Sequence, residues 1–343
     1  MRAWLARHLS RMWWRPQPTL VARALTPLAW LARVVTDARR RRVRAWRAPC
    51  PVIVVGNLVV GGAGKTPTVI ALVQALRAAG RRPGVVSRGY GRRSSGVQVA
   101  ADGGDAATLG DEPWLIHRST GVPVVVGEAR VAAAQALLHR HPEVDVVVAD
   151  DGLQHAALAR DLEVWVFDER GVGNGLGLPA GPLRQPLPAQ LPTHACVLYN
   201  APAPSTPLPG ALAGRALAGA LPLPEWTAGR ALRPQALAAL AALARAERPL
   251  PAIAGIAAPQ RFFTMLRDAG ITIAERALPD HASLQHLPWP EGTPEVICTE
   301  KDAAKLTGRA LGGTRVWVVG LDFRLPAPFV ADLLARLPAP RLP

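Results

Sequence analysis

Short apolar runs alternate with longer amphipathic runs along most of the chain after Pro51. The short runs are rich in Val and Ile and predict buried strands, whereas apolar residues three and four apart predict helices. The strands are expected at residues 52–55, 83–87, 122–126, 144–149 and 162–167. The helices between them are expected at residues 66–79, 114–119 and 128–139. Such alternation is typical of βαβ units, so we expect an α/β fold with a doubly wound, mostly parallel sheet.

A second, smaller α/β pattern follows a Pro-rich stretch at residues 201–210. Its helices are expected at residues 235–247 and 260–268, and its strands at residues 252–256, 271–273, 295–298 and 316–319. Composition and pattern together divide the chain into three parts. These are a basic segment at residues 1–49, a core domain at 50–205 and a small C-terminal α/β domain at 206–330.

The basic segment carries most of the positive charge of the chain. It contains twelve Arg and a single acidic residue, Asp37, which gives +11 of the net charge of +15, and it holds five of the ten Trp. Arg interleaved with Trp and Leu is typical of the membrane interface. The longest charge-free run, residues 24–32, has nine residues, whereas a membrane span needs about 20. We therefore expect amphipathic helices on an anionic membrane surface; the alternative is a helix packed on the protein's own core with a solvated Arg face.

A glycine-rich segment between the first strand and the first helix has the context of a Walker-type phosphate loop. Its glycines let backbone N–H groups turn towards phosphate oxygens, and the following helix adds the positive end of its dipole. Lys65 is expected to bridge the β- and γ-phosphates of ATP, and Thr66 to bind Mg²⁺. The strict pattern has Gly where this chain has Val59, so the loop is a variant, and a glycine-rich loop without a ligand is the alternative. The predicted ATP-binding residues are Val59, Val60, Gly61, Gly62, Ala63, Gly64, Lys65 and Thr66.

Two adjacent carboxylates, Asp150 and Asp151, end the apolar strand at residues 144–149. Ligands of open α/β sheets bind beyond the carboxyl ends of the strands, so we expect Mg²⁺ at this pair, together with Thr66. A turn followed by a helix N-cap is the alternative.

Lysine is scarce in this chain and occurs only at Lys65, Lys301 and Lys305. A chain so rich in Arg keeps Lys where a compact ammonium is needed. Lys301 and Lys305 are one helical turn apart and are expected to share a face, although the pattern does not say what that face contacts.

Other P-loop classes fit the sequence less well. In the segment Thr299-Glu300-Lys301-Asp302 the Lys and Asp are adjacent, which is the wrong spacing for a guanine-specific GTPase, and Val60 stands where partner-positioning ATPases have Lys. No Cys/His cluster supports a metal-delivery GTPase. A P-loop NTPase switch of this kind stays the alternative function. A nucleic-acid-binding ATPase rests only on the Arg-rich start, and we expect no nucleic-acid partner.

Seven motifs in order resemble those of the tetraacyldisaccharide 4'-kinases of bacterial lipid A biosynthesis. They are Val55-Gly56-Asn57-Leu58 with Gly61 to Pro67, Ser87-Arg88-Gly89-Tyr90-Gly91, Gly110-Asp111-Glu112-Pro113, Asp150-Asp151-Gly152-Leu153-Gln154-His155, Leu178-Pro179-Ala180-Gly181-Pro182-Leu183-Arg184, Pro279-Asp280-His281 and Thr299 to Leu306. The resemblance covers the chain from the basic segment to about Leu306.

The resemblance implies a kinase that transfers the γ-phosphate of ATP, with Mg²⁺, to the 4'-hydroxyl of a tetraacyl glucosamine disaccharide 1-phosphate, giving lipid IVA. It also implies a P-loop kinase core, a small C-terminal domain that closes over the nucleotide, and a peripheral or monotopic location on the cytoplasmic face of the bacterial inner membrane. The substrate comes wholly from this resemblance, and the oligomeric state is not implied.

The resemblance also assigns roles to individual residues. Asp111 matches the catalytic base of the family, and His281 matches the histidine that pairs with it. Lys65 is the third predicted catalytic residue. The sequence alone favours a helix N-cap for Asp111 and a loop histidine for His281, and the resemblance reverses this interpretation. Arg88 and Arg184 are candidates for binding the phosphate of the lipid, because a guanidinium fork suits phosphate oxygens. The full set of candidate substrate-binding residues is Asn57, Arg88, Glu112, Gln154, His155 and Arg184.

Overall fold

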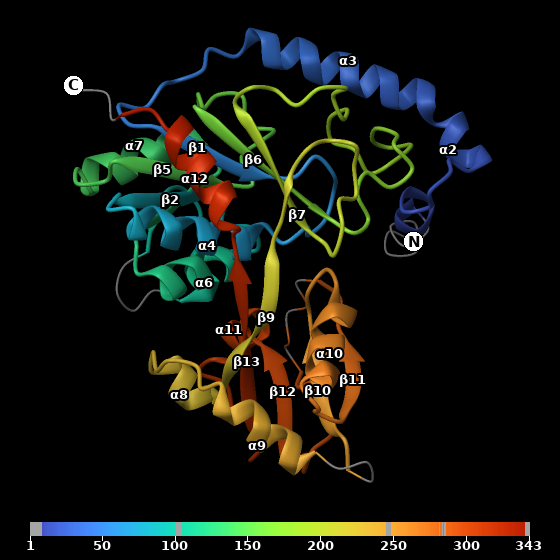
Figure 1. The fold of residues 1–343 in the computed structure, drawn as a ribbon, viewed down its shortest axis with the longest axis vertical. Coiled ribbons are helices and arrows are strands. Elements are labelled where there is room, and N and C mark those ends of the chain that lie inside the picture. The colour runs from blue at the N-terminus through green and yellow to red at the C-terminus, as the bar shows by residue number, and fades with distance from the viewer. Residues whose placement is uncertain are drawn as a thin grey trace. The chain divides into compact units, whose positions relative to one another are not determined.

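The structure of the protein is a computed structural model that describes residues 9–100, 105–244, 248–280, 282, 284 and 286–339. Its chain divides into two compact units, each assembled from separate stretches of sequence. The first unit comprises Met1–Arg88, Val122–Ala213 and Leu325–Pro343, and the second comprises Gly89–Gly121 and Gly214–Arg324. In Figure 1 each unit combines strands and helices, so both are α/β structures.

A parallel sheet forms the centre of the first unit, with the strand order β4-β2-β5-β1-β6-β7-β8. The strands are β1 (Val52–Gly56), β2 (Pro83–Ser87), β4 (Val124–Val126), β5 (Val146–Asp150), β6 (Leu162–Asp168), β7 (Ala195–Asn200) and β8 (Ala211–Leu212). All residues of β1 to β7 in this sheet are buried, as expected of a parallel sheet covered on both faces. The predicted doubly wound, mostly parallel sheet is confirmed.

The helices of the first unit connect and cover these strands. α4 begins directly after the glycine-rich loop and buries Val69, Leu72 and Leu76 at helical spacing. The helices are α2 (Leu20–Ala24), α3 (Thr26–Arg42), α4 (Lys65–Ala78), α7 (Arg130–Arg140) and α12 (Ala327–Arg336).

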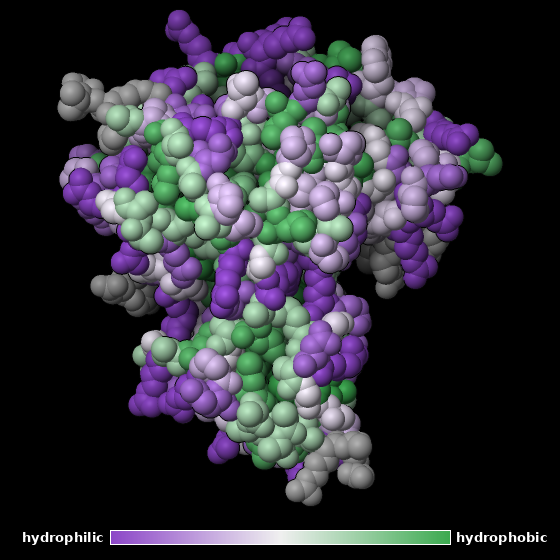
Figure 2. All heavy atoms as spheres, in the orientation of Figure 1, coloured by the Kyte–Doolittle hydropathy of each residue, from purple (hydrophilic) through white to green (hydrophobic). Residues whose placement is uncertain are grey.

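The N-terminal helices leave their apolar side chains in solvent. α3 buries none of its residues, and Figure 2 shows hydrophilic and hydrophobic spheres interleaved where it lies. Eight of the twelve exposed large hydrophobic residues in the described part of the chain come from this segment: Leu20, Val21, Leu28, Trp30, Leu31, Val34, Val35 and Val43. Within the described residues, no helix combines the length and apolar character that a membrane span requires.

The second unit contains its own mixed sheet, with the strand order β11-β10-β12-β13-β9. Its strands are β9 (Gly214–Pro222), β10 (Leu250–Ala254), β11 (Ile273–Ala277), β12 (Glu295–Thr299) and β13 (Arg315–Arg324), and β3 (Gln98–Val99) also falls in this unit. Only β9 runs antiparallel among the pairings of this five-stranded sheet. Its helices are α5 (Ala106–Leu109), α6 (Asp111–Thr120), α8 (Leu223–Thr227), α9 (Gln235–Leu243), α10 (Pro259–Asp268) and α11 (Glu300–Leu306).

The two units differ from the contiguous parts expected from the sequence. Residues 89–121 group with the second unit, because their side chains contact helices that follow residue 214. The guanidinium of Arg118 stacks 4.1 Å above the ring of Trp226, and Trp226 in turn donates to Glu300 at 3.3 Å. The C-terminal residues 325–343 return to the first unit. Each unit therefore combines stretches that lie far apart in the sequence.

Candidate active site

Polar residues gather where the strands of the parallel sheet end. The last residues of four of its strands are both polar and buried: Ser87, Asp150, Asp168 and Asn200. Asn57 directly follows β1 and is also buried. Because ligands of open α/β sheets bind beyond the carboxyl ends of the strands, this edge is the candidate active site of the first unit.

Asn200 fixes the glycine-rich loop against this edge. Its Nδ2 donates to the carbonyl oxygen of Ala63 at 3.0 Å. Gly64 adopts a φ of +93°, and a Cβ there would lie 2.1 Å from Nδ2 of Asn200. Glycine is required at position 64 both by this left-handed conformation and by the space available. The backbone is thus held in place immediately before Lys65 and the start of α4.

The ammonium of Lys65 lies among oxygen atoms of the protein. Its Nζ is 3.2 Å from Oδ1 of Asn57, 3.4 Å from the carbonyl oxygen of Gly61 and 3.6 Å from Oδ1 of Asp151. The side chain is only 10% exposed. A phosphate oxygen brought to this loop would compete with these oxygens for the same cation.

Asp151 links the phosphate loop to Arg184. Its Oδ1 accepts a hydrogen bond from Nη1 of Arg184 at 3.2 Å, and the same nitrogen donates to Oε1 of Gln154 at 3.1 Å. Burial opposes the charge of Asp151, but Lys65, Arg184 and Arg130 outweigh burial and lower the pKa of this carboxyl group. Asp151 therefore carries its negative charge at neutral pH.

Gln154 and His155 both contact backbone oxygens. Nε2 of Gln154 donates to the carbonyl oxygen of Asn57 at 3.3 Å, and Nε2 of His155 is 3.2 Å from that of Glu128. Burial lowers the pKa of His155, which favours the neutral ring. Arg88 follows β2 and is exposed. Of the predicted residues, the structure thus joins Asn57, Lys65, Asp151, Gln154 and Arg184 in one network.

Asp150 points its carboxylate into the buried sheet edge. Its Oδ2 accepts a hydrogen bond from the hydroxyl of Ser87 at 3.0 Å. Among the described residues, no group of three or more His, Cys, Asp or Glu is arranged to hold a metal ion. The predicted metal residues Thr66, Asp150 and Asp151 offer one hydroxyl and two carboxylates as oxygen donors. This set fits Mg²⁺, which binds through one or two carboxylates and takes its other ligands from phosphates and water.

Asp111 and Glu112 form the first turn of α6 in the second unit. Oδ2 of Asp111 is 3.4 Å from Nζ of Lys305, and Oε1 of Glu112 accepts a hydrogen bond from Nζ of Lys301 at 3.0 Å. The two lysines therefore face the two adjacent carboxylates.

The structure decides one of the alternatives left open for Asp111. Gly110 occupies the N-cap position of α6, and Asp111 is the first helical residue, so Asp111 is not the N-cap. His281 lies outside the described residues, and its pairing with Asp111 stays a prediction.

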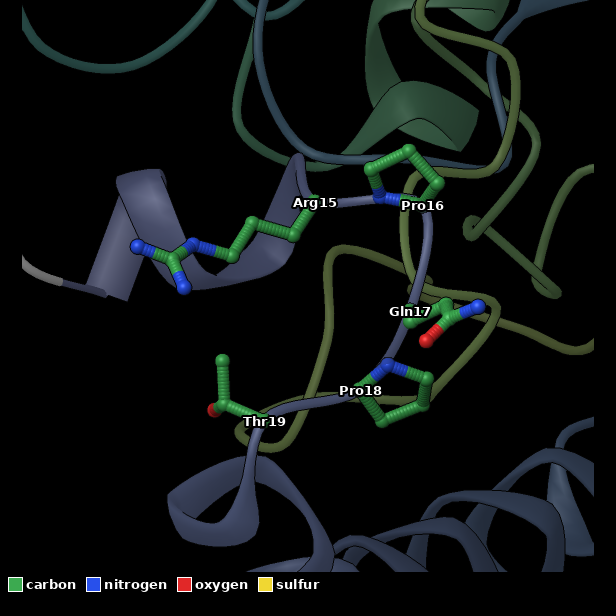
Figure 3. A pocket seen from close by; sticks show the side chains of 5 residues that line it. All are labelled: Arg15, Pro16, Gln17, Pro18 and Thr19. Atoms are coloured by element: carbon green, nitrogen blue, oxygen red, sulfur yellow. The ribbon is translucent and has the colours of Figure 1, made fainter.

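A hollow near the N-terminal helices has no comparable chemistry. Figure 3 shows that its lining comes from one continuous stretch, Arg15 to Thr19, which connects residues 9–13 to α2. The hydroxyl of Thr19 accepts a hydrogen bond from the backbone N–H of Ala22 and so caps α2. We assign no ligand to this hollow, because the hydroxyl of Thr19 already caps α2 and the lining comes from one short connection.

Comparison with known proteins identifies the family. The profile of the tetraacyldisaccharide-1-P 4'-kinase family, LpxK, matches residues 21–338. The chain belongs to the LpxK family. It is 54% identical to the tetraacyldisaccharide 4'-kinase of Methylibium petroleiphilum, over 97% of this chain and 94% of that protein. It is 51% identical to that of Leptothrix cholodnii, over 93% and 92% of the two chains.

A solved LpxK structure shares the fold. The crystal structure of LpxK from Aquifex aeolicus in complex with ATP matches with a TM-score of 0.72 and 26% sequence identity. The match covers 92% of this chain and 99% of that chain. The resemblance inferred from the seven motifs is thereby confirmed.

Sequence reasoning missed residues that hold the phosphate loop of this LpxK chain. Asp168 ends β6, which was predicted as far as residue 167, and Asn200 ends β7, which was not predicted. Both strands end in a polar residue, as β5 does at Asp150. That repeated feature, a polar residue after an unbroken apolar run, is the signal in the sequence that could have found both. Arg170 gives no such signal, because it lies in an irregular loop of an Arg-rich chain.

Arg170 joins the loop of this LpxK chain to its N-terminal segment. Its Nε and Nη2 donate to Oδ2 of the buried Asp168 at 2.9 and 2.6 Å, and Nε also lies 3.2 Å from Oδ1. Nη2 donates in addition to the carbonyl oxygen of Gly62 at 2.9 Å. The planar face of the guanidinium lies over the ring of Trp14, with 4.2 Å between the guanidinium carbon and the ring centre. One planar cation thus contacts the phosphate loop, the sheet edge and the basic segment.

Replacing Arg170 with Lys is expected to raise the KM for ATP by about tenfold, with a smaller effect on kcat. A single ammonium keeps the charge beside Asp168 but replaces the fork that also holds Gly62. Initial rates against ATP concentration measure the change. Arg81→Lys is the matched control. Arg81 pairs with Asp145 just before β2 begins, at the end of the parallel strands that lies opposite to the phosphate loop. Equal KM values for wild type and Arg170→Lys would contradict a role in holding the loop.

Proposed function

We propose that the protein is an ATP-dependent tetraacyldisaccharide 4'-kinase. In this proposal it transfers the γ-phosphate of ATP to the 4'-hydroxyl of a tetraacyl glucosamine disaccharide 1-phosphate and forms lipid IVA. The observation that carries it is the family match over residues 21–338, in a chain whose variant phosphate loop lies at the carboxyl edge of a parallel sheet. The ATP named for the Aquifex aeolicus structure supports the choice of nucleotide.

Phosphoryl transfer needs positioning and neutralisation of charge more than covalent chemistry. Lys65 supplies a cation at the N-terminus of α4, where backbone N–H groups also face an anion. In the state described here, that cation is paired with Asp151. We infer that the phosphates of ATP replace Asp151 as partners of this ammonium. Asp151 would then keep its hydrogen bond with Arg184 and could hold the metal.

Thr66, Asp150 and Asp151 would hold Mg²⁺, which neutralises charge on the phosphates when it is bound. The bond from Ser87 orients the carboxylate of Asp150, and Arg184 orients that of Asp151. These two bonds prevent the adjacent carboxylates from turning freely.

Asp111 accepts the proton of the attacking hydroxyl in this proposal, with His281 as its partner. A carboxylate with a positioned imidazole is a common arrangement for general base catalysis. Arg88 and Arg184 are proposed to bind phosphate of the lipid, and Asn57, Glu112, Gln154 and His155 to bind polar groups of the substrates.

Transfer of label from γ-labelled ATP into a chloroform-soluble disaccharide phosphate tests the function. We expect label in the lipid when Mg²⁺ is present and none when Mg²⁺ is chelated. A disaccharide already phosphorylated at the 4' position is the matched control and should accept no label. Label found only in inorganic phosphate would contradict the kinase and favour the P-loop NTPase switch.

We also propose that the N-terminal helices bind the cytoplasmic face of the bacterial inner membrane peripherally. The exposed apolar residues of α2 and α3 lie in the segment that carries +11 of net charge. Apolar area and positive charge together are what bind an amphipathic helix to anionic lipid. The substrate implied for this family is a lipid, so a surface that binds a membrane would place the protein near its substrate.

Replacing Leu31 and Val35 with Asp should lower binding to anionic vesicles by about tenfold or more. Both side chains are exposed on successive turns of α3, so the change removes apolar contact and adds negative charge without disturbing a core. Flotation with vesicles of phosphatidylglycerol measures the bound fraction. Leu243→Asp makes the same change at an exposed residue of α9 and should bind as wild type does. Full flotation of the double variant would exclude this surface.

A further inference from the structure

Two of the three lysines in the chain lie on one short helix, α11, and both contact the first turn of α6. Lys301 contacts Glu112, and Lys305 contacts Asp111. In a chain whose other basic side chains, apart from Lys65, are Arg or His, this repeated use of Lys against two adjacent carboxylates needs an explanation.

Lys305 is buried in a way that contributes little to stability. Its side chain is 7% exposed, and its Nζ donates no hydrogen bond within the described part of the chain. Its one ion pair there is with Oδ2 of Asp111, at 3.4 Å. A buried ammonium that gains no hydrogen bonds adds little to stability, because the cost of desolvation offsets its attraction to the carboxylate.

Lys301 has a different set of partners. Its Nζ donates to Glu112 at 3.0 Å and to Asp280 at 3.1 Å. Burial opposes the charge of Lys301, but these two carboxylates outweigh burial and raise its pKa. Lys301 is therefore shared between two acids, whereas Lys305 serves Asp111.

We propose that Lys305 is a positioning residue that holds the carboxylate of Asp111 in the orientation needed for proton transfer. The inference rests on the proposed function, in which Asp111 accepts the proton of the attacking hydroxyl. A general base works only when it is positioned at the proton that it accepts, and an ion pair on one carboxylate oxygen fixes that position. Because the ammonium contacts Oδ2, the other oxygen, Oδ1, is left for the proton.

Among the described residues, no other cation near Asp111 can replace this contact. The charged groups around it are Lys301, Lys305 and the buried Asp302 on α11, Glu112 on α6, and Asp280 after β11. Without Lys305, one ammonium remains among these carboxylates, and it is already shared by Glu112 and Asp280. Asp111 then loses its described ion pair, so its carboxylate is no longer held in one orientation.

Lys305→Met and Lys305→Arg test the proposal in the full-length protein. Met keeps the length and packing of the side chain without the charge, and Arg keeps the charge. We expect Lys305→Met to lower kcat by about tenfold to a hundredfold, because the base is then poorly positioned. The KM for ATP should change by less than about threefold, and Lys305→Arg should restore most of kcat. Lys305→Gln replaces the Met variant if that variant does not fold.

Combination with Asp111→Asn separates this proposal from the proposed function. If Lys305 acts through Asp111, Lys305→Met should cost nothing further in the Asp111→Asn background. An equal loss in both backgrounds, or a Lys305→Arg variant no faster than Lys305→Met, would overturn the role of Lys305 and leave the base intact. Normal turnover of Asp111→Asn alone would instead overturn the base. Lys301→Met is the comparison, and its kcat should fall less than that of Lys305→Met.

Discussion

Replacing Lys65 with Ala is expected to lower kcat by at least about 10³-fold. The ammonium is the positive side chain at the start of α4, and its neighbours Asn57, Gly61 and Asp151 offer oxygens only. Without it, the β- and γ-phosphates of ATP would meet these oxygens with no cation of the loop between them. The label-transfer assay with saturating lipid and Mg²⁺ measures the loss.

Arg77→Ala is the control for this prediction, because it removes a cation from the other end of the same helix. It should keep at least about half of the wild-type rate, as expected of a surface substitution. A thermal melt of both variants shows whether they fold. A folded Lys65→Ala protein with a tenth or more of the wild-type rate would show that the loop does not bind the reacting phosphates.

Hydrophobic pattern alone predicted five of the seven described strands of the parallel sheet, and β7 and β8 were missed. The predicted strand at residues 83–87 has the exact bounds of β2, and the strand at 162–167 is one residue shorter than β6. These strands are buried on both faces, so most of their residues are apolar. β9 and α12 were missed as well. The first half of β9 is exposed or half-buried and the strand contains two glycines, and α12 has Pro at its N-cap and again in its first turn.

The candidate site was predicted as far as contiguous motifs allow. Asn57, Lys65, Asp151, Gln154 and Arg184 come from three motifs, and the structure joins them in one network. Each motif combines a glycine or a strand end with a polar residue, which is a local pattern. The partners of Lys301 and Lys305 had no local pattern, because 189 residues separate Lys301 from Glu112. Contacts of that kind depend on how α6 and α11 pack.

Replacing Asp111 with Asn is the second prediction with a large effect, and it should lower kcat by on the order of 10²–10⁴. Asn keeps the size of the side chain but cannot accept a proton at neutral pH. The KM for ATP should barely change, because the described contacts of Asp111 are with Lys305 and not with the phosphate loop. Asp105→Asn is the matched control, since Asp105 is an exposed acid that caps the adjacent α5, and Asn caps helices equally well.

The double variant Asp111→Asn with His281→Ala tests whether the two residues form one proton-accepting unit. Each single change should then cost a similar factor, and the double change should cost little more than either, because residues that act as a unit are strongly non-additive. Single-turnover rates at saturating ATP separate this loss from product release. If the two losses multiply, His281 acts apart from the base, for instance in binding the lipid. In that case Lys305 would be the one partner of Asp111 that the described contacts support, and the rescue of kcat by Lys305→Arg would decide whether an ion pair positions this carboxylate.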